Sequence, residues 1–428
     1  CTCTVPSILP AGRTWTDSLN QIQGAHVLCI GAGIEQLPVI RLAQQMGLHV
    51  TAVDGDPKAV GLLVAARSRV MDIRNSDAVI QFAKDRNIRC LLPVPLGAIL
   101  TTVGAVNDAL KFRGISEASA QACTDKHVAH HLLTEAGIPI PKFAIATTER
   151  DIAAIADRTI GFPVVLKPRS GSGSQGVFVA RSISELHDWL PWHLEQRLKN
   201  NPSNHTIVEQ FIPGQEVGVD GVIVDDQYAS LLIRDKEVTD LPFRLPYAFL
   251  APTQLSEATQ HHVSAIVARA VAALGLRNCL VHADVILADD GKVYVVDLSG
   301  RPSGFNISAR MIPEAIGVDP IRQTIQLSLG FAAAFQPMYQ RGTVLRMLSA
   351  PQGYLHAVEG MEQVRQLPGV VAAETFLHPG DLIQERRTGA AYAVGYLLTT
   401  ADTRDEANLL WQQAAQSIHF CVTEQAPQ

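Results

Sequence analysis

The chain has 428 residues, of which 47% are hydrophobic and 18% are charged, and its formal net charge is −6. A disordered or solvating chain would be rich in charge and poor in apolar residues, so that class is excluded. The mild acidity argues against a dedicated nucleic-acid binder, which usually has a strongly basic domain. At roughly 150 residues per domain, the length predicts two to four domains.

The sequence contains no uninterrupted run of 18 apolar residues, so we expect no membrane partner. Residues 1–15 lack the basic start and the long apolar core of a signal peptide. The cysteines are odd in number and scattered, and the close pair Cys1 and Cys3 does not have the CxxC spacing. Reduced thiols fit this pattern best, so we expect a cytoplasmic protein.

The first region alternates strands and helices, which predicts a doubly wound parallel sheet that closes near residue 120. The expected elements are a strand at 26–33, a helix at 34–46, a strand at 49–53, a helix at 76–86, a strand at 88–94 and a helix at 98–113. Gly31, Gly33 and Asp54 form a partial dinucleotide fingerprint, but Gln36 stands at the third glycine position. NAD binding is therefore a weak alternative to a tight turn that needs glycine.

Beyond residue 120 the pattern changes to mixed strands, with helices expected at 182–198 and 256–274. The last hundred residues predict a separate α+β unit, with strands near 343–349, 369–374 and 391–399 and helices at 359–366 and 403–418. We thus expect three domains: a Rossmann-like domain over 1–120, a central domain over 121–330 with a lid at about 138–206, and a C-terminal α+β domain over 331–428.

A loop rich in glycine and serine lies between two expected strands, from Ser170 to Gly176. Its many backbone N–H groups could cover phosphates, and Lys167 at the end of the preceding strand would meet them as a point charge. The loop is not a Walker loop, because Val177 replaces the lysine and a strand follows. The alternative is a flexible surface hairpin.

Glu209 and Glu216 flank a turn at the end of another expected strand. Such carboxylates can accept hydrogen bonds from an amino group or from vicinal hydroxyls, but glutamates at strand ends are commonly just solvated. His130, His131, His261 and His262 lie on expected helices, and we interpret them as structural or solvated.

The most informative feature is a hairpin around Asp290-Gly291, which is a strong two-residue turn signal. That turn pairs Asp289 with Lys292 and places Asp284 directly opposite Asp297. Alternation then assigns His282, Asp284, Asp297, Ser299 and Arg301 to one face, and Val281, Ala283, Val285, Leu287, Val296 and Leu298 to the core.

Opposed carboxylates destabilise a sheet unless something neutralises them. A divalent cation with oxygen ligands, Mg²⁺ where phosphates share it, is the simplest answer. A proton shared by one carboxyl, or pairing of both aspartates with Arg301, are the alternatives.

Four features, in their order along the chain, resemble the ATP-grasp superfamily. They are a lysine that opens the second region, the LKP segment with the Gly-rich loop, VEQFIPGQE, and the acidic hairpin that ends in DLSGRPSG. The resemblance covers residues 26–428. Within the superfamily it is most similar to the bacterial L-amino-acid ligases of the bacilysin-synthetase type. The C-terminal segments at 350–353, 367–370 and 378–381 and the closing helix are similar to that group's C-terminal domain.

The resemblance implies a role for each matching residue. ATP phosphates would contact Lys126 and Lys167 beneath a flap that contains Ser174, Gln175 and Gly176. The adenine would lie beside Glu209, Gln210 and Ile212, and the ribose beside Glu216. Mg²⁺, or Mn²⁺ in its place, would bind Asp284 and Asp297. Arg301 would stabilise the acyl-phosphate and the oxyanion, and Ser303, Gly304 and Phe305 would shape the pocket of the first amino acid.

The implied activity is ATP-dependent ligation of two L-amino acids into a dipeptide through an acyl-phosphate, with small-molecule amino acids as the only partners and a homodimer left open. This chain departs from most of the superfamily, because aspartates replace glutamates at 284 and 297 and Ser299 replaces a common asparagine. Three alternatives stay open: an ATP-grasp enzyme that uses bicarbonate or formate, a non-catalytic nucleotide-binding module, and the NAD-dependent oxidoreductase.

Overall fold

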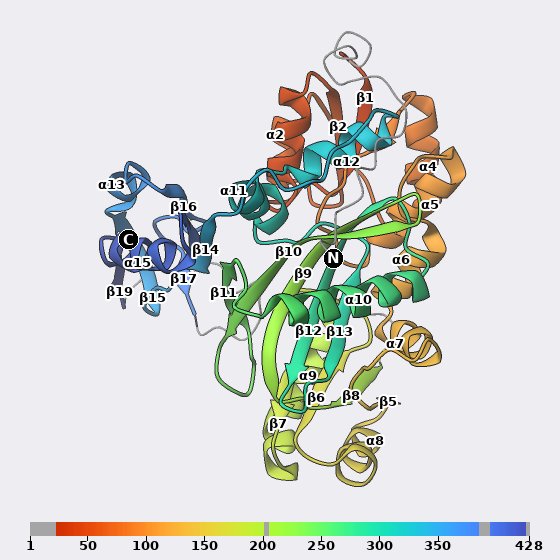
Figure 1. Ribbon diagram of the computed structural model, residues 1–428, viewed down its shortest axis with the longest axis vertical. Helices are drawn as coiled ribbons and strands as arrows, with labels where there is room; N and C mark the ends of the chain where they lie inside the picture. The colour runs from red at the N-terminus through yellow and green to blue at the C-terminus, as the bar shows by residue number, and fades with distance from the viewer. Residues whose placement is uncertain (1–22, 201–204, 385–393, 425–428) are drawn as a thin grey trace.

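The computed structural model describes residues 23–200, 205–384 and 394–424, so the cysteines at 1 and 3 and the start of the expected first domain lie outside it. A parallel four-stranded sheet of order β3-β2-β1-β4 forms the N-terminal region, shown in red and orange in Figure 1. Its elements are β1 (His26–Ile30), α2 (Leu37–Gln45), β2 (His49–Asp54), α3 (Val60–Val64), β3 (Arg67–Val70), α4 (Ser76–Asp85), β4 (Cys90–Leu91), α5 (Leu100–Leu110) and α6 (Glu117–Thr124).

Alternate residues of β1 are buried on opposite faces of this sheet. Val27 packs into one hydrophobic cluster with Val39 of α2, and Leu28 packs into another with Val79 and Phe82 of α4. Helices therefore cover both faces, which confirms the expected doubly wound architecture. Strand β4 is shorter than expected, because it is followed by two prolines that cannot donate to a ladder.

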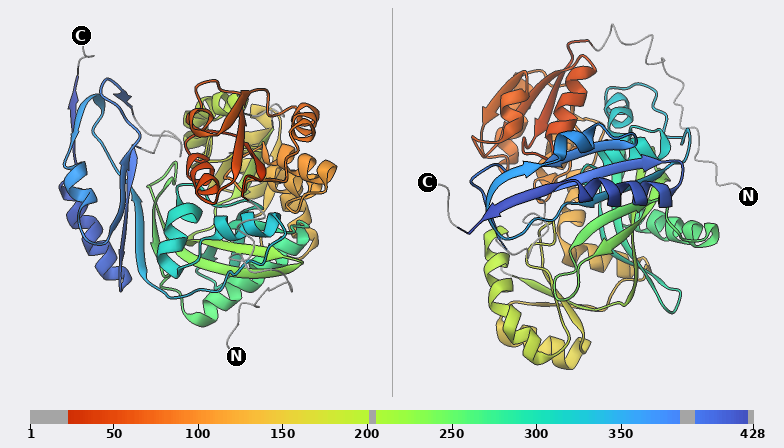
Figure 2. Two further views of the ribbon diagram at one scale, coloured as in Figure 1. Left: turned by 90° about the horizontal axis from the view of Figure 1, so that it is seen from above. Right: turned by 90° about the vertical axis from the view of Figure 1, so that its left-hand side faces the viewer.

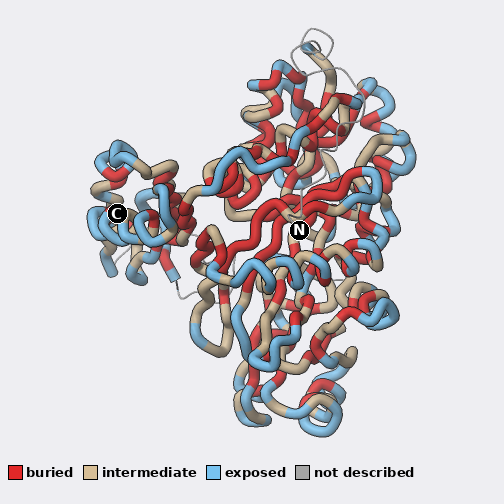
Figure 3. Tube along the Cα trace, viewed as in Figure 1, coloured by how far each residue is buried: buried red, intermediate tan, exposed pale blue. Residues whose placement is uncertain are grey.

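An antiparallel eight-stranded sheet of order β13-β12-β9-β10-β11-β14-β18-β16 forms the middle of the molecule. Its strands are β9 (Gly214–Val224), β10 (Gln227–Val238), β11 (Pro246–Ala251), β12 (Cys279–Ala288), β13 (Val293–Ser299), β14 (Gly342–Met347), β16 (Val370–Thr375) and β18 (Gly395–Ala401). The last three come from the C-terminal hundred residues, so the central and C-terminal regions share one continuous sheet. Helix α10 (Glu257–Ala273) packs on it, and Figure 3 shows the buried strands running through the molecule.

A second four-stranded sheet, of order β5-β8-β6-β7, forms a lobe at the bottom of Figure 1. It contains β5 (Phe143–Ala146), β6 (Val164–Pro168), β7 (Phe178–Ala180) and β8 (Thr206–Gln210), with α8 (Glu149–Ala154), the π-helical η1 (Ile155–Ile160) and α9 (Ile183–Asn200) beside them. Helix α7 (Lys126–Glu135) leads into this lobe. The Gly-rich loop connects β6 to β7, so it lies at one edge of the lobe.

The C-terminal region adds a small sheet of order β17-β15-β19, seen at one side of the molecule in Figure 2. Its strands are β15 (Gly353–Glu359), β17 (Leu382–Ile383) and β19 (His419–Thr423). Helices α13 (Met361–Arg365) and α15 (Arg404–Gln416) pack against β16 and β18 of the large sheet. No helix in the described residues is long and apolar enough to cross a membrane.

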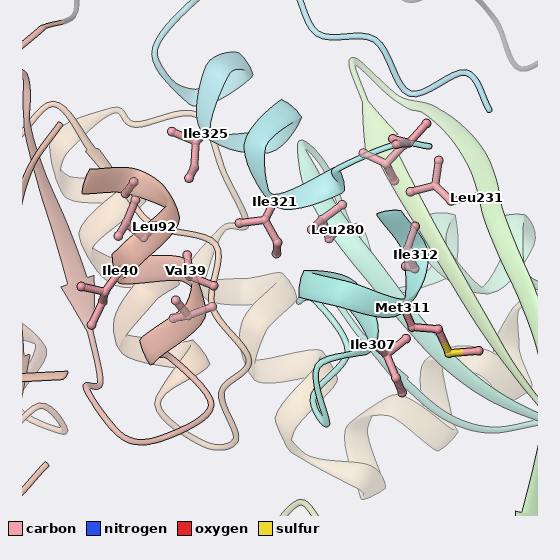
Figure 4. Packing of buried hydrophobic residues seen from close by; sticks show 14 of the residues in the cluster. Val39, Ile40, Leu92, Leu231, Leu280, Ile307, Met311, Ile312, Ile321 and Ile325 are labelled. Atoms are coloured by element: carbon pink, nitrogen blue, oxygen red, sulfur yellow. The ribbon is translucent and has the colours of Figure 1, made fainter. Parts of the chain in front are cut away.

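Three short helices after the acidic hairpin return the chain to the N-terminal region: η2 (Ile307–Met311), α11 (Ile312–Ile316) and α12 (Pro320–Ser328). Ile307 and Ile321 are buried in the same hydrophobic cluster as Val39 and Ile40 of α2, as Figure 4 shows. This packing brings the segment 301–305 against the loops that follow β1 and β4.

Candidate active site

Asp284 of β12 lies directly opposite Asp297 of β13, as predicted, but the turn and the register of the hairpin differ from the predicted ones. Ala288 N–H donates to Lys292 O at 2.9 Å, and Leu287 pairs with Val293, so the turn has three residues and not two. Asp289 therefore does not pair with Lys292. A β-bulge next to Asp284 adds one residue on β13 and restores the predicted pair.

Because of the bulge, the prediction that Val296 belongs to the core is wrong. Val296 is only partly buried and lines a cleft beside Asp297. Val293 and Val295 occupy the buried positions of β13, together with Leu298. The bulge is the reason, since one extra residue reverses the faces of the strand on its turn side.

Asp284 is neutralised by a residue that the sequence analysis did not select. Lys236 of β10 places Nζ 2.8 Å from Asp284 Oδ1. Burial alone would raise the pKa of Asp284, but the Lys236 ammonium outweighs it and holds that pKa well below its usual value. A shared proton is therefore disfavoured. Arg301 forms no ion pair with either aspartate in the part of the chain that the structure describes.

Glu216 lies beside the same lysine. Its Oε1 is 2.6 Å from Nη2 of Arg244, and its Oε2 is 3.8 Å from Lys236 Nζ. Arg244 belongs to the segment between β10 and β11. Glu216 thus lines the cleft with one charge partner on each side.

Glu209 is buried and paired twice. Its Oε2 lies 2.6 Å from Lys167 Nζ, and its Oε1 lies 2.8 Å from Nε2 of His130. Burial raises the pKa of Glu209, but Lys167 and His130 together lower it to about 2. The sequence offered one signal for His130: it stands four residues after Lys126, on the same face of a helix.

The Gly-rich loop is held from two sides. Lys126 Nζ donates to Gly171 O at 3.0 Å, and Arg169 donates to Asp125 just before that lysine. At the other end, Nδ1 of the buried His193 is 2.6 Å from Gly176 O. Gly171, Gly173 and Gly176 have positive φ, as a loop that exposes successive backbone N–H groups requires.

These groups surround one cleft of about 1100 Å³, counting its open mouth. We call it the main cleft. The predicted residues that line it are Lys126, Lys167, Ser174, Gln175, Glu209, Gln210, Ile212, Glu216, Asp284 and Asp297. Residues far apart in the sequence therefore meet in one place. Gly176, which was also predicted, does not line the cleft, and its carbonyl oxygen lies against Nδ1 of His193.

The other predicted residues lie beside this cleft and do not line it. Arg301 donates through Nη1 to Pro302 O at 2.9 Å and lines a neighbouring cavity. Ser303 is buried and donates to Asp220 Oδ1. Phe305 N–H donates to Glu35 Oε2 at 2.9 Å, and Gly304 lies against the same carboxylate.

Arg234 of β10 is a second residue that sequence reasoning missed. Its side chain is fully buried, with Nε 3.0 Å from Asp220 Oδ2 and Nη2 3.3 Å from Nδ1 of His282. Arg234 pairs with Gly218 of β9, and Gly218 pairs with Asp284 of β12. These three residues therefore lie in one row across the sheet.

Among the described residues, no group of three or more His, Cys, Asp or Glu is arranged to hold a metal ion. Two facing carboxylates still fit Mg²⁺ when the remaining oxygen ligands come from phosphates and water, which is how this ion is usually bound. The donor set is thus suited to a metal–nucleotide complex and not to a metal alone.

The main cleft lies between two lobes, and the Gly-rich loop covers it. Two lysines lie on one side of the cleft and two facing aspartates on the other. This arrangement defines an ATP-grasp protein. Comparison with known families agrees: residues 160–309 match the ATP-grasp domain, and residues 346–423 match the L-amino acid ligase C-terminal domain 2. The chain therefore contains an ATP-grasp domain and the C-terminal domain 2 of the L-amino acid ligases.

Similar proteins of known sequence span most of the chain. An uncharacterized protein, y4rH, of Sinorhizobium fredii is 26% identical over 415 residues, covering 95% of this chain and 85% of that protein. A formate-dependent phosphoribosylglycinamide formyltransferase of Nitratiruptor is 25% identical over 392 residues, covering 89% and 93%.

Solved structures share the fold. The L-amino acid ligase from Bacillus licheniformis has a TM-score of 0.80 at 21% identity, covering 94% of this chain and 99% of that one. A biotin carboxylase domain from Hydrogenobacter thermophilus, solved with MgADP and bicarbonate, has a TM-score of 0.72 at 16% identity, covering 92% and 90%. At these identities the likeness establishes architecture alone.

Proposed function

We propose that the chain is an ATP-dependent ligase that joins two L-amino acids into a dipeptide and releases ADP and phosphate. The observation that supports this most directly is the match of residues 346–423 to the L-amino acid ligase C-terminal domain. Strands of that segment extend the same sheet that bears Asp284 and Asp297. The C-terminal segment and the strands that carry the two aspartates are thus parts of one sheet.

In this proposal the nucleotide occupies the main cleft. Lys126 and Lys167 approach the phosphates, and the loop of Ser174, Gln175 and Gly176 covers them. Because Glu209 is already bound to Lys167 and His130, its task is to fix that lysine. The adenine contacts then fall to the backbone of Gln210 and Ile212.

Glu216 would hold the ribose hydroxyls after its oxygen exchanges one of its present partners. Asp284 and Asp297 would hold Mg²⁺, or Mn²⁺ in its place, and the bound ion would neutralise phosphate charge. Lys236 would then turn from Asp284 towards the phosphoryl oxygens.

The chemistry needs no nucleophile from the protein. A carboxylate is a poor electrophile until ATP converts it to an acyl-phosphate, whose carbonyl an amine can attack. Arg301 would offer preorganised positive charge to the carboxylate and to the oxyanion. The flap would keep water from the reactive intermediate.

The test is incubation of the protein with ATP, Mg²⁺ and pairs of amino acids, with phosphate assay and mass analysis of the products. ADP, phosphate and a dipeptide are expected. AMP and pyrophosphate would contradict the acyl-phosphate route.

The similarity to a formate-dependent formyltransferase favours a second candidate, an ATP-grasp enzyme that activates formate or bicarbonate. Omission of amino acids separates the two candidates. Turnover that formate or bicarbonate supports alone would favour the second.

A further inference from the structure

Strand β3 is the outer edge of the N-terminal sheet, and all four of its residues are exposed. It pairs in parallel with β2, where Thr51 lies beside Arg67 and Val53 beside Arg69. Val53 packs into the hydrophobic cluster that contains Phe82 of α4. Because side chains alternate between the two faces of a strand, Arg67 and Arg69 lie on the face of the sheet that α4 covers.

A hollow opens on this face between β3 and the end of α4. Its volume is about 940 Å³, counting its open mouth, and its lining residues are Thr51, Arg67, Ser68, Arg69, Phe82 and Arg86. We call it the arginine hollow. None of these six residues lines the main cleft, so the arginine hollow is a separate place on the molecule.

Two of the arginines lie near one aromatic ring. The guanidinium carbon of Arg86 is 3.7 Å from the centroid of the Phe82 ring, and that of Arg69 is 5.8 Å from it. The ring attracts each cation, but the two cations repel each other. Arg67 adds a third cation, because residues two apart on a strand lie only about 7 Å from each other. Three positive charges thus gather around one hollow.

No acidic side chain compensates these charges in the described part of the chain. None of the three arginines forms an ion pair there, whereas the exposed Arg277 lies 2.6 Å from Asp226. Asp85, next to Arg86 in the sequence, instead accepts a hydrogen bond from Gln81 at 2.7 Å. The net charge of the chain is −6, so this local excess of positive charge stands out. Such an excess attracts anions.

The buried side of the arginine hollow offers a hydroxyl group. Thr51 is 5% exposed, and among the described residues its Oγ1 has no hydrogen-bond partner. Buried polar groups nearly always have a partner in folded proteins. Since Thr51 lines the hollow beside Arg67, its hydroxyl is a donor for a ligand that enters the hollow.

We propose that the arginine hollow binds the phosphate group of a small anion, which is either inorganic phosphate or a phosphate ester. Phosphate oxygens accept paired hydrogen bonds from planar guanidinium groups, and a dianion matches several such groups better than a singly charged carboxylate does. The ligand needs no nucleobase, because Phe82 is buried and Arg86 already covers its ring. The site uses no residue of the main cleft and therefore goes beyond the proposed ligase function.

The experiment is calorimetric titration of the full chain with sodium phosphate at constant ionic strength. The double variant Arg67→Gln/Arg69→Gln should bind phosphate about tenfold more weakly or worse, because two charged hydrogen-bond donors are removed. Its fold should be retained, since both side chains are exposed on an edge strand. The control Arg74→Gln/Arg89→Gln removes the same charge from exposed positions outside the hollow and should leave the affinity unchanged. Any phosphate that enters the main cleft would bind all three proteins alike.

A further variant tests the hydroxyl group. Thr51→Val is nearly isosteric and keeps the branched side chain, so it should weaken phosphate binding by about fivefold through loss of one hydrogen bond. Thermal unfolding of this variant checks that the sheet is intact.

A second set of titrations identifies the ligand class. Whichever of inorganic phosphate and glycerol 3-phosphate binds more tightly identifies the free ion or the ester as the ligand, and acetate should bind at least about tenfold more weakly than either. Equal phosphate affinity of the wild type and Arg67→Gln/Arg69→Gln, or an equal loss in the control variant, would overturn the proposal. Acetate binding as tight as phosphate binding, or no binding of either phosphate compound to the wild type, would overturn it as well. These titrations involve no turnover, so their failure is distinct from failure of the dipeptide ligase assay.

Discussion

Lys236 and Asp284 form an ion pair across strand β9, with 2.8 Å between Nζ and Oδ1. They belong to β10 and β12, which both pair with β9. The lysine side chain is 7% exposed and the aspartate side chain 28%, so the pair lies partly buried at the wall of the main cleft. This lysine supplies Asp284, one of the two facing aspartates, with a positive charge.

If Lys236 and Mg²⁺ share Asp284, removal of the lysine should strengthen metal binding. In the ADP-bound protein, Lys236→Met is expected to lower the half-saturating Mn²⁺ concentration on the order of tenfold. The reason is that a positive charge within about 4 Å of the metal site, at partial burial, weakens cation binding by that much or more. Electron paramagnetic resonance of free Mn²⁺ measures this. Lys236→Arg, which keeps the charge, should differ little from wild type, and unchanged Mn²⁺ affinity in Lys236→Met would show that the two cations do not compete.

Asp297 tests the metal site from the other strand. Asp297→Asn should reduce ATP turnover by about 100-fold or more. The substitution would remove a charged ligand of the metal ion, and that ion would neutralise the phosphate charge during transfer. Asp289→Asn changes an exposed aspartate in the adjoining turn and should retain activity. Phosphate release at saturating ATP distinguishes the two, and an active Asp297→Asn would reject the metal assignment.

The hairpin shows how far the sequence could lead. Alternation and the Asp-Gly turn signal predicted both strands and the Asp284–Asp297 pair. They could not predict that a three-residue turn and a bulge would each shift the register by one residue. The two shifts cancel at the aspartates but not at Val296, because that side chain lies between them.

Lys236, Arg234 and His130 could not be predicted in the same way. Lys236 and His130 reach their partners only after a strand or helix distant in the sequence has packed beside them, and Arg234 faces Asp220 only in the register of the β9–β10 pair. Lys236 needs the order of β10, β9 and β12, and His130 needs α7 to lie against β8. The sequence motifs located the main cleft, whereas its charge balance depends on tertiary packing.

The pairing of Glu209 predicts a pH dependence of stability. Its pKa is about 2 in the folded protein against 4.5 for an ordinary glutamate, so its contribution is complete above pH 4.5 and is lost as the pH falls from 4.5 towards 2. Urea unfolding between pH 5 and pH 3 should show falling free energy for the wild type. Glu209→Gln should be less stable at pH 7 by about 3–5 kcal/mol, because Lys167 stays buried without its partner.

The difference between the two proteins should narrow as the pH falls through that window. A constant difference would mean that Glu209 contributes through packing and not through its charge. Glu135→Gln, at an exposed site, controls for the loss of one glutamate.

Gly218 should be irreplaceable because Arg234 crosses it. A Cβ at residue 218 would lie 1.5 Å from Nη1 of Arg234, a distance that no shift of a single torsion can relieve in a fully buried guanidinium. Gly218→Ala must therefore move Arg234 away from Asp220, and separation of a buried ion pair costs about 3–5 kcal/mol. Thermal and urea unfolding should show this loss, while Gly55→Ala, where the nearest heavy atom is 3.8 Å from the added Cβ, should change stability little. A Gly218→Ala protein as stable as the wild type would show that the ion pair between Arg234 and Asp220 does not need a glycine at residue 218.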